Sequence, residues 1–139
     1  FGDPETQAVL MRLDSDLAEA LAATADGHLD RVQLSWSDDA AVCVVMAAGG
    51  YPGHYVKGSP ISGLAAAAAT GAVVFHAGTA RAADGGIVTN GGRVLGVTAR
   101  GATIQDAVRK AYEAAHCISW DGAYYRHDIA HRAFGRSAT

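Results

Sequence analysis

Cysteine is scarce in this sequence, and long apolar runs are absent. The two cysteines among its 139 residues, Cys43 and Cys117, lie far apart, form no CxxC motif and stand in no zinc-ligand pattern. We therefore expect both to be reduced core residues of a cytoplasmic protein. The longest apolar stretches are too short to cross a bilayer and no signal-peptide pattern is visible, so we expect no membrane partner.

Charged residues are also few, at 18%, and the formal net charge is -3. No basic stripe is present, so nucleic acid is not an expected partner. Half of the residues are hydrophobic, which is typical of a globular chain with room for one ordinary domain, or for a small domain plus part of another. Because the chain opens with Phe1 and enters a helix start at once, we expect it to be a piece of a longer protein.

The centre of the sequence is an apolar run followed by a loop rich in turn-forming residues. Residues 41–48 are all apolar, which predicts a fully buried strand. Residues 49–60 combine glycines and prolines with tyrosine, histidine and Lys57. A polar loop at the end of a rigid strand is a common place for a binding site. The alternative is a structural turn with a surface lysine, and the residues of this stretch leave both interpretations open.

Two helix signals come early in the chain. The first is Asp3-Pro4-Glu5-Thr6, where Asp3 is expected to cap the helix and Pro4 to take its first position, with the helix running to about Leu13. The second should have Ser15 as its cap and should end at Asp26-Gly27.

The remaining pattern predicts an antiparallel sheet covered by a helix. Asn90-Gly91-Gly92 predicts a hairpin turn with positive φ between strands at 87–89 and 93–99. Other strands are expected at 31–36, which alternates polar and apolar residues, at 72–76 and at 124–129. Residues 103 to about 118 form the strongest helix signal, because Thr103 and Asp106 have capping-box spacing ahead of an apolar face. We therefore predict the α+β class, with a small, curved antiparallel sheet and one packed helix.

Two short segments could contact a ligand. Gly2-Asp3-Pro4-Glu5-Thr6 places two carboxylates and free N–H groups at a helix N-terminus, which can orient an ammonium or a phosphate, although capping alone explains much of the pattern. Gly91-Gly92-Arg93 lets the backbone approach a ligand and adds a guanidinium suited to phosphate. The alternative there is a plain hairpin with a surface arginine.

Other kinds of site find little support in the sequence. His127, Asp128 and His131 lie close together but lack a matching ligand set, so we expect no metal site there. No serine or cysteine stands in a recognisable nucleophile setting, and no P-loop is present.

Five motifs, in order along essentially the whole chain, resemble the C-terminal third of the phosphoribosylamine–glycine ligases, which belong to the ATP-grasp superfamily. They are FGDPETQ (1–7), YPGHYVKG (51–58), VFHAGT (74–79), TNGGRVLGVTA (89–99) and SWDGAYYRHDIAHRA (119–133). The resemblance implies an ATP-dependent carbon–nitrogen ligase of purine biosynthesis. Such a ligase joins phosphoribosylamine and glycine to give glycinamide ribonucleotide, through a glycyl phosphate, with ATP and Mg²⁺ or Mn²⁺.

The resemblance also implies a division of the chain and a set of substrate contacts. Residues 1–30 would be the end of the ATP-grasp domain, and residues 31–139 a small C-terminal domain of barrel-sandwich-hybrid type. The implied substrate-binding residues are Asp3, Pro4, Glu5, Lys57, Gly58, Gly92 and Arg93, with Gly92-Arg93 reaching the ribose phosphate. The metal-ligating glutamate and asparagine and the nucleotide-binding lysines would stand before Phe1. We therefore expect no catalytic residue here, an inactive fragment, and the remainder of the enzyme as its partner.

A function of another class is a non-catalytic carrier or interaction domain, since barrel-sandwich folds also carry biotin or lipoate on a hairpin lysine. Lys57 is the candidate lysine near a turn, but Val56 and Gly58 do not give the Met-Lys-Met context of biotin attachment. A third alternative is a purely structural piece. We favour the ligase because it accounts for all five motifs.

Overall fold

The computed structural model describes residues 2–134 and is built on a four-stranded antiparallel sheet. The strand order is β2-β5-β1-β6, with β2 at Val73–His76, β5 at Arg93–Gly101, β1 at Ala40–Ala48 and β6 at Ala123–Tyr125. A second sheet pairs β3 (Thr79–Arg81) with β4 (Ile87–Thr89). The predicted combination of helices with antiparallel sheets is confirmed.

The two long strands β1 and β5 form the centre of the core. Val44 lies opposite Val97, and both are fully buried, as are Met46 and Leu95, which face each other two positions along. A branched or long apolar side chain in such a position gains about 1.5–3 kcal/mol from burial. The first half of β1 alternates between buried and half-buried residues, so the prediction of a fully buried strand holds only for its last three residues.

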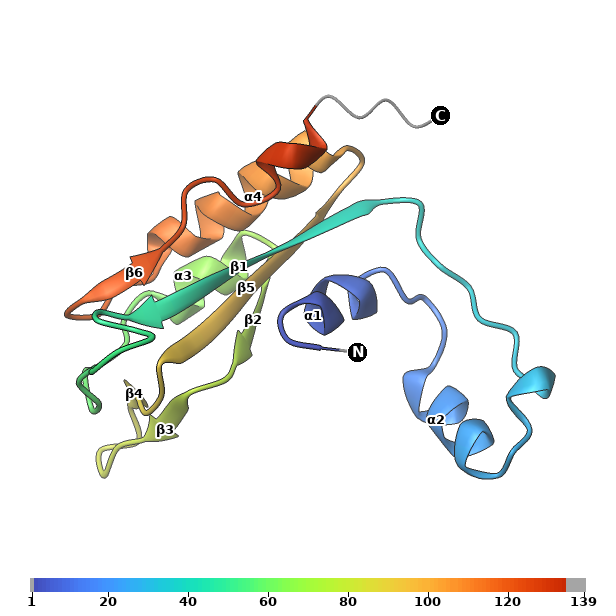
Figure 1. The fold of residues 1–139 in the computed structure, drawn as a ribbon, viewed down its shortest axis with the longest axis horizontal. Helices are drawn as coiled ribbons and strands as arrows, with labels where there is room; N and C mark the ends of the chain where they lie inside the picture. The colour runs from blue at the N-terminus through green and yellow to red at the C-terminus, as the bar shows by residue number, and fades with distance from the viewer. Residues whose placement is uncertain (1, 135–139) are drawn as a thin grey trace.

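Helix α4 (Ile104–Cys117) lies along the sheet, with the short α3 (Leu64–Ala69) beside it (Figure 1). Thr103 caps α4 as predicted, because its hydroxyl accepts a hydrogen bond from the Asp106 N–H at 3.1 Å. The face of α4 toward the sheet consists of small residues, which lets helix and sheet approach closely. The fully buried members are Ala107, Ala111, Ala114 and Ala115.

The N-terminal helices begin later than predicted. Helix α1 spans Glu5–Leu10 with Pro4, not Asp3, at its N-cap position, and no side chain caps it. Helix α2 spans Leu17–Ala25, and its cap is Asp16, whose carboxylate accepts from the Ala18 N–H at 2.8 Å. The Ser15 hydroxyl instead accepts a hydrogen bond from the Ser35 N–H at 2.6 Å. The predicted stop is confirmed, since Asp26 is the C-cap and Gly27 has φ +73°.

The predicted strand at 31–36 is wrong. The 3₁₀ turn η1 (Leu29–Arg31) is followed by an irregular segment whose one bridge joins Leu13 to Trp36. The end of this segment pairs instead with the residues that follow α1: the Asp14 N–H donates to the Ser35 carbonyl at 3.0 Å, and the Ser37 N–H donates to the Arg12 carbonyl at 2.7 Å.

The predicted hairpin at Asn90-Gly91-Gly92 is also wrong. Strand β4 pairs with β3, whereas β5 pairs with β1 and β2, and neither Gly91 nor Gly92 has positive φ. The glycines are needed for close approach instead, because the Gly78 backbone lies against Gly91 and the Gly78 carbonyl accepts from the Asn90 N–H at 2.7 Å. The last strand is shorter than predicted: only residues 123–125 pair, and the 3₁₀ turn η2 (His131–Ala133) follows.

Both cysteines are free thiols and half-buried, with Cys43 in β1 and Cys117 at the end of α4. Burial raises the pKa of the Cys43 thiol. No helix among residues 2–134 is long and apolar enough to span a membrane. The predictions made for Phe1 and for the end of the chain lie outside the described residues.

Candidate functional site

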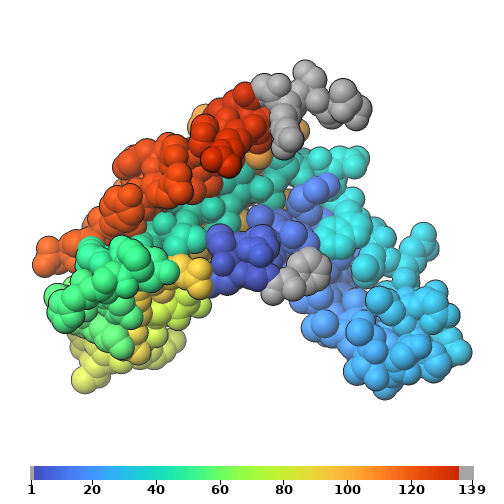
Figure 2. All heavy atoms as spheres, in the orientation of Figure 1, coloured from blue at the N-terminus to red at the C-terminus, as the bar shows by residue number. Residues whose placement is uncertain are grey.

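The structure brings two of the predicted site segments together at the start of β5. The Arg93 guanidinium holds Asp3 twice: one terminal nitrogen lies 2.9 Å from a carboxylate oxygen, and the other donates to the Asp3 backbone carbonyl at 3.3 Å. In the space-filling view the N-terminal segment (blue) lies directly beside the residues that lead into β5 (Figure 2). Both side chains are nearly half exposed, so the pair lies at the surface.

Asp3 is held by a second partner, which explains why it does not cap α1. The Gln7 amide donates to the other carboxylate oxygen at 3.2 Å. The first turn of α1 is completed instead by the Gly2 carbonyl, which accepts from the Thr6 hydroxyl and from the Thr6 N–H. Asp3 therefore links the first turn of α1 to β5.

The central loop packs onto the other predicted segment. Gly92 lies under the rings of Tyr51 and Tyr55, whose centroids are 6.4 Å apart. A methyl group at Gly92 would lie within 2.8 Å of the Tyr51 ring, so only glycine fits without moving that ring. The Gly92 carbonyl also accepts from the Ala48 N–H at 2.8 Å, which joins the end of β1 to the approach to β5.

Lys57 and Gly58 lie further along the same loop, where it runs beside β4. Gly58 has φ +88°, and its N–H donates to the Thr89 carbonyl at 2.7 Å. The next N–H, that of Ser59, donates to the Thr89 hydroxyl at 3.1 Å. Lys57 itself is exposed, and its ammonium makes no ion pair among residues 2–134. The loop thus holds a free ammonium on a fixed backbone.

The charges of these segments fall into two groups. Asp3 and Arg93 are paired with each other, whereas Glu5 and Lys57 have no ion-pair partner in the described part of the chain. A guanidinium has five N–H donors; one of those on Arg93 donates to the Asp3 carbonyl, and a second nitrogen is ion-paired with the Asp3 carboxylate. The arrangement therefore offers one exposed carboxylate, one exposed ammonium and the guanidinium donors that Asp3 does not use.

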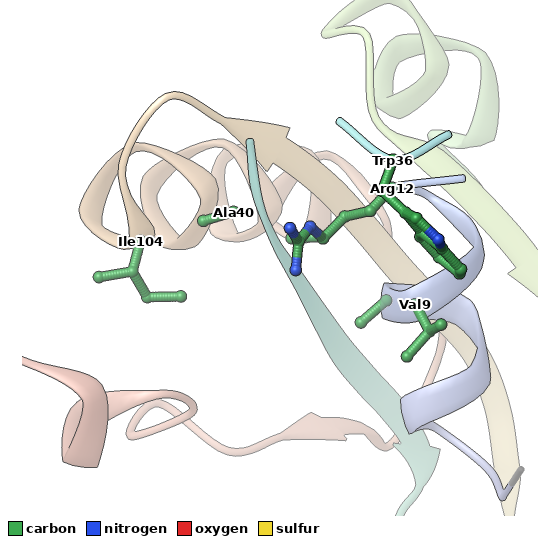
Figure 3. Close-up of a pocket in the computed structure, with 7 residues that line it drawn as sticks. Val9, Arg12, Trp36, Ala40 and Ile104 are labelled. Atoms are coloured by element: carbon green, nitrogen blue, oxygen red, sulfur yellow. The ribbon is translucent and has the colours of Figure 1, made fainter. Parts of the chain in front are cut away.

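Sequence reasoning missed a hollow of about 340 Å³ between α1 and the start of β1 (Figure 3). The Arg12 guanidinium lies at this hollow and donates to the Ser37 carbonyl at 3.0 and 3.2 Å. Its other lining side chains are apolar: Ala8, Val9, Trp36, Ala40, Ala41 and Ile104. Neither Asp3, Lys57 nor Arg93 lines it. No local motif marks it, because its residues come together only through the packing of α1 on the sheet.

The residues described by the structure contain no group of three or more His, Cys, Asp or Glu side chains that could hold a metal ion. Asp128 is instead gripped by Arg126 at 2.6 and 2.8 Å. This hydrogen bonding lowers the pKa of Asp128 to about 2. The carboxylate is therefore paired with an arginine, and the His131 Nδ1 lies further from it, at 4.0 Å.

Comparison with known proteins identifies the family. Residues 41–132 match the model of the phosphoribosylglycinamide synthetase C domain. The chain is 53% identical over 135 residues to the chloroplastic phosphoribosylamine–glycine ligase of Arabidopsis thaliana, and 52% identical over 136 residues to the ligase of that name from Pseudomonas putida. These matches cover 96% and 98% of this chain, but only 25% and 31% of the relatives.

A solved structure agrees with these matches. The phosphoribosylamine–glycine ligase of Thermotoga maritima superimposes with a TM-score of 0.81 at 37% identity, over 94% of this chain and 31% of that one. The chain thus spans about a third of the length of most of these ligases. Because residues 41–132 match its model, this chain belongs to the family of phosphoribosylglycinamide synthetase C domains.

Proposed function

We propose that the chain is the C-terminal part of an ATP-dependent ligase that joins phosphoribosylamine and glycine to give glycinamide ribonucleotide. The observation that carries this proposal is the match of 96–98% of the chain to phosphoribosylamine–glycine ligases at 52–53% identity. Enzymes of purine biosynthesis act on soluble metabolites, and we propose a cytoplasmic location.

We further propose that residues 1–30 complete an ATP-grasp domain and that residues 31–139 form a separate C-terminal domain on a barrel-sandwich scaffold. Two observations support this division. The first thirty residues are mainly helical, and the family model begins only at residue 41.

The proposed substrate contacts are those at the start of α1, in the central loop and at the start of β5. Arg93 would hold the ribose phosphate with the donors that Asp3 leaves free, since a phosphate accepts several charge-assisted hydrogen bonds. Asp3 would orient the guanidinium, as an acidic side chain does when it fixes the plane of an arginine. Lys57, with Gly58 fixing its backbone, would add a second positive charge.

Glu5 would contact the amine of a substrate rather than its phosphate. Its exposed carboxylate has no ion-pair partner among residues 2–134, so an incoming amine would meet an uncompensated negative charge. Pro4 and Gly92 would act through shape: Pro4 precedes the first turn of α1, and Gly92 leaves room for the tyrosine rings.

ATP and Mg²⁺ or Mn²⁺ would bind outside this chain. Residues 2–134 contain no group of three or more His, Cys, Asp or Glu side chains that could hold a metal ion. Phosphoryl transfer depends on cations that position and neutralise the phosphates. We therefore propose that the activating chemistry belongs to the preceding part of the ligase, and that the chain alone is inactive.

Steady-state kinetics test the proposed contacts. The test protein is a fusion, which we call the joined ligase. In it, the portion of the Pseudomonas putida relative that lies outside the match precedes this chain. Arg93→Ala should lower kcat/KM for phosphoribosylamine about 10- to 1,000-fold, because one or two bonds of about 1.5–3 kcal/mol are lost. The effect should fall chiefly on KM, while KM for ATP and glycine stays nearly constant. Unchanged kinetics, or an equal loss for all three substrates, would contradict this role.

The carrier function has less support. The residues that follow Lys57 in the chain are hydrogen-bonded to β4, so this lysine does not stand at the tip of a free hairpin, where a swinging biotinyl or lipoyl arm is carried. Intact-mass measurement of the native protein distinguishes the two functions, since a biotinyl or lipoyl adduct on Lys57 would favour the carrier.

A further inference from the structure

Five large apolar side chains are exposed together on residues 17–36. Between 38% and 60% of the surface of each is exposed, and they are Leu17, Leu21, Leu29, Leu34 and Trp36. With neighbouring residues of α1 and α2 they line an open hollow of about 170 Å³. Its one hydroxyl, on Thr24, is already bonded to the Ala20 carbonyl at 2.7 Å, so the hollow offers no polar group to a ligand. Apolar patches of this kind mark interaction surfaces. We call these five side chains the α2 surface.

The α2 surface is held in place but left uncovered. Helix α1, which supplies one wall, packs on β1 and β5 and is tied to them through Arg93 and Arg100, the latter donating to the Met11 carbonyl at 3.0 Å. Helix α2 packs instead on η1, and only Ala20 of its nine residues is buried. Figure 1 shows α2 standing away from the sheet. An isolated nine-residue helix is marginal in water, so α2 depends on contacts along its apolar face.

The comparisons indicate what covers this surface. The family model begins at residue 41, so the α2 surface lies outside the C domain. Matches to the ligases nevertheless extend over 98% of the chain, so the relatives share this segment too. In those relatives the matched part is only 31–32% of the length. The remaining portion of these relatives is therefore the part of the protein that can cover the α2 surface.

We infer that the α2 surface docks the preceding portion of the same ligase, which must present an apolar face with a bulky side chain for the hollow. This inference rests on the proposed function, because it identifies the partner as the rest of that enzyme. Contacts between parts of one chain commonly bury 600–1,500 Å². Five half-exposed apolar side chains are a suitable centre for an interface of this size.

Thiol labelling of single positions tests the inference in the chain alone and in the joined ligase. Leu21→Cys is the reporter, because its side chain is 60% exposed, and Val56→Cys, 70% exposed on the central loop, is the matched control. Labelling at each position is measured by peptide mass spectrometry, which separates it from labelling of the two natural cysteines. We expect residue 21 to react at least ten times more slowly in the joined ligase than in the chain alone. Residue 56 should react at similar rates in both proteins.

A second variant keeps the test independent of the cysteine substitution. Leu21→Glu should leave the unfolding midpoint of the chain alone nearly unchanged, whereas it should lower that of the joined ligase. Equal labelling of residue 21 in both proteins, or an equal effect of Leu21→Glu on both midpoints, would overturn the inference. Ligase activity of the joined protein is assayed in parallel. Activity with residue 21 unprotected would refute the docking surface alone, and protection without activity would refute the ligase function alone.

Discussion

Asp3 and Arg93 lie 90 residues apart in the sequence, yet the guanidinium of one grips both the carboxylate and the backbone carbonyl of the other. This contact joins the first turn of α1 to the start of β5. It also settles the direction of the Arg93 side chain, since both terminal nitrogens of its guanidinium lie against Asp3.

A double-mutant cycle measures how much this contact stabilises the fold. Asp3→Ala and Arg93→Ala should each destabilise the chain slightly, with a coupling energy of about 0.2–1 kcal/mol, because both groups are nearly half exposed and screened by water. Urea unfolding of the four proteins gives the value. Asp3→Ala combined with Arg126→Ala serves as control and should be additive. A coupling energy of zero for the first pair would mean that the contact adds nothing to the stability of the fold.

Replacement of a core side chain should be far more damaging. Leu95→Ala removes a side chain that is 1% exposed between β1 and β2, and should destabilise the chain by about 2–5 kcal/mol. Val56→Ala, at a position that is 70% exposed, should change stability by less than about 0.5 kcal/mol. Both are measured by denaturant unfolding. Similar values for the two variants would show that β5 is not the core strand.

Two glycines with the same backbone conformation should respond differently to alanine. Gly63 and Gly71 have φ of +82° and +85°. Alanine at either position should therefore lower the free energy of unfolding by about 1–2 kcal/mol, because a Cβ is unfavourable in left-handed backbone. A methyl group at Gly71 meets nothing within 4 Å, whereas one at Gly63 strikes the Cys117 carbonyl at the end of α4. Gly63→Ala should therefore destabilise by at least a further ~1–3 kcal/mol. Equal unfolding midpoints would contradict the packing of residue 63 against α4.

Asp128 should titrate well below an ordinary aspartate. Hydrogen bonding from Arg126 lowers its pKa from the usual 3.8 to about 2. Since the folded pKa is the lower one, any stability that this pair adds is complete above pH 3.8 and is lost as the pH falls toward 2. NMR titration of the Asp128 carboxyl should give a midpoint near 2, moving toward 3.8 in Arg126→Ala. A midpoint near 3.8 in the unmodified chain would rule out the pairing.

Elements whose signals are local could be predicted from the sequence. Helix α4 is the best example: its cap at Thr103 and its small apolar face act within a few residues, and both are found as expected. Strand β1 was predictable for the same reason, because eight consecutive apolar residues need burial wherever they lie.

Elements that depend on distant partners could not be predicted. Asn90-Gly91-Gly92 has the composition of a hairpin turn, but Gly78 occupies the position that a folded-back strand would need. Residues 31–36 alternate as a strand does, but the end of this segment is bonded to residues 12–14 rather than to the sheet.

The candidate site shows the same limit. Residue types marked the segments 2–6 and 91–93, and the resemblance to the ligase family supplied the set of substrate-binding residues. The Asp3–Arg93 pair and the packing of Tyr51 on Gly92 emerge only in three dimensions. The hollow beside Arg12 had no local signal, because it is lined by segments that meet only on folding. Leu17 and Leu21 of the α2 surface lie at helical spacing in the sequence, but that spacing does not show that they stay exposed.

The most direct test of the whole account is an assay for glycinamide ribonucleotide with phosphoribosylamine, glycine, ATP and Mg²⁺. We predict that the joined ligase forms this product together with one ADP per turnover, and that the chain alone forms none under the same conditions. A folded joined ligase that makes no product, or a purified chain that makes it unaided, would contradict the assignment of this chain as the C-terminal part of the ligase.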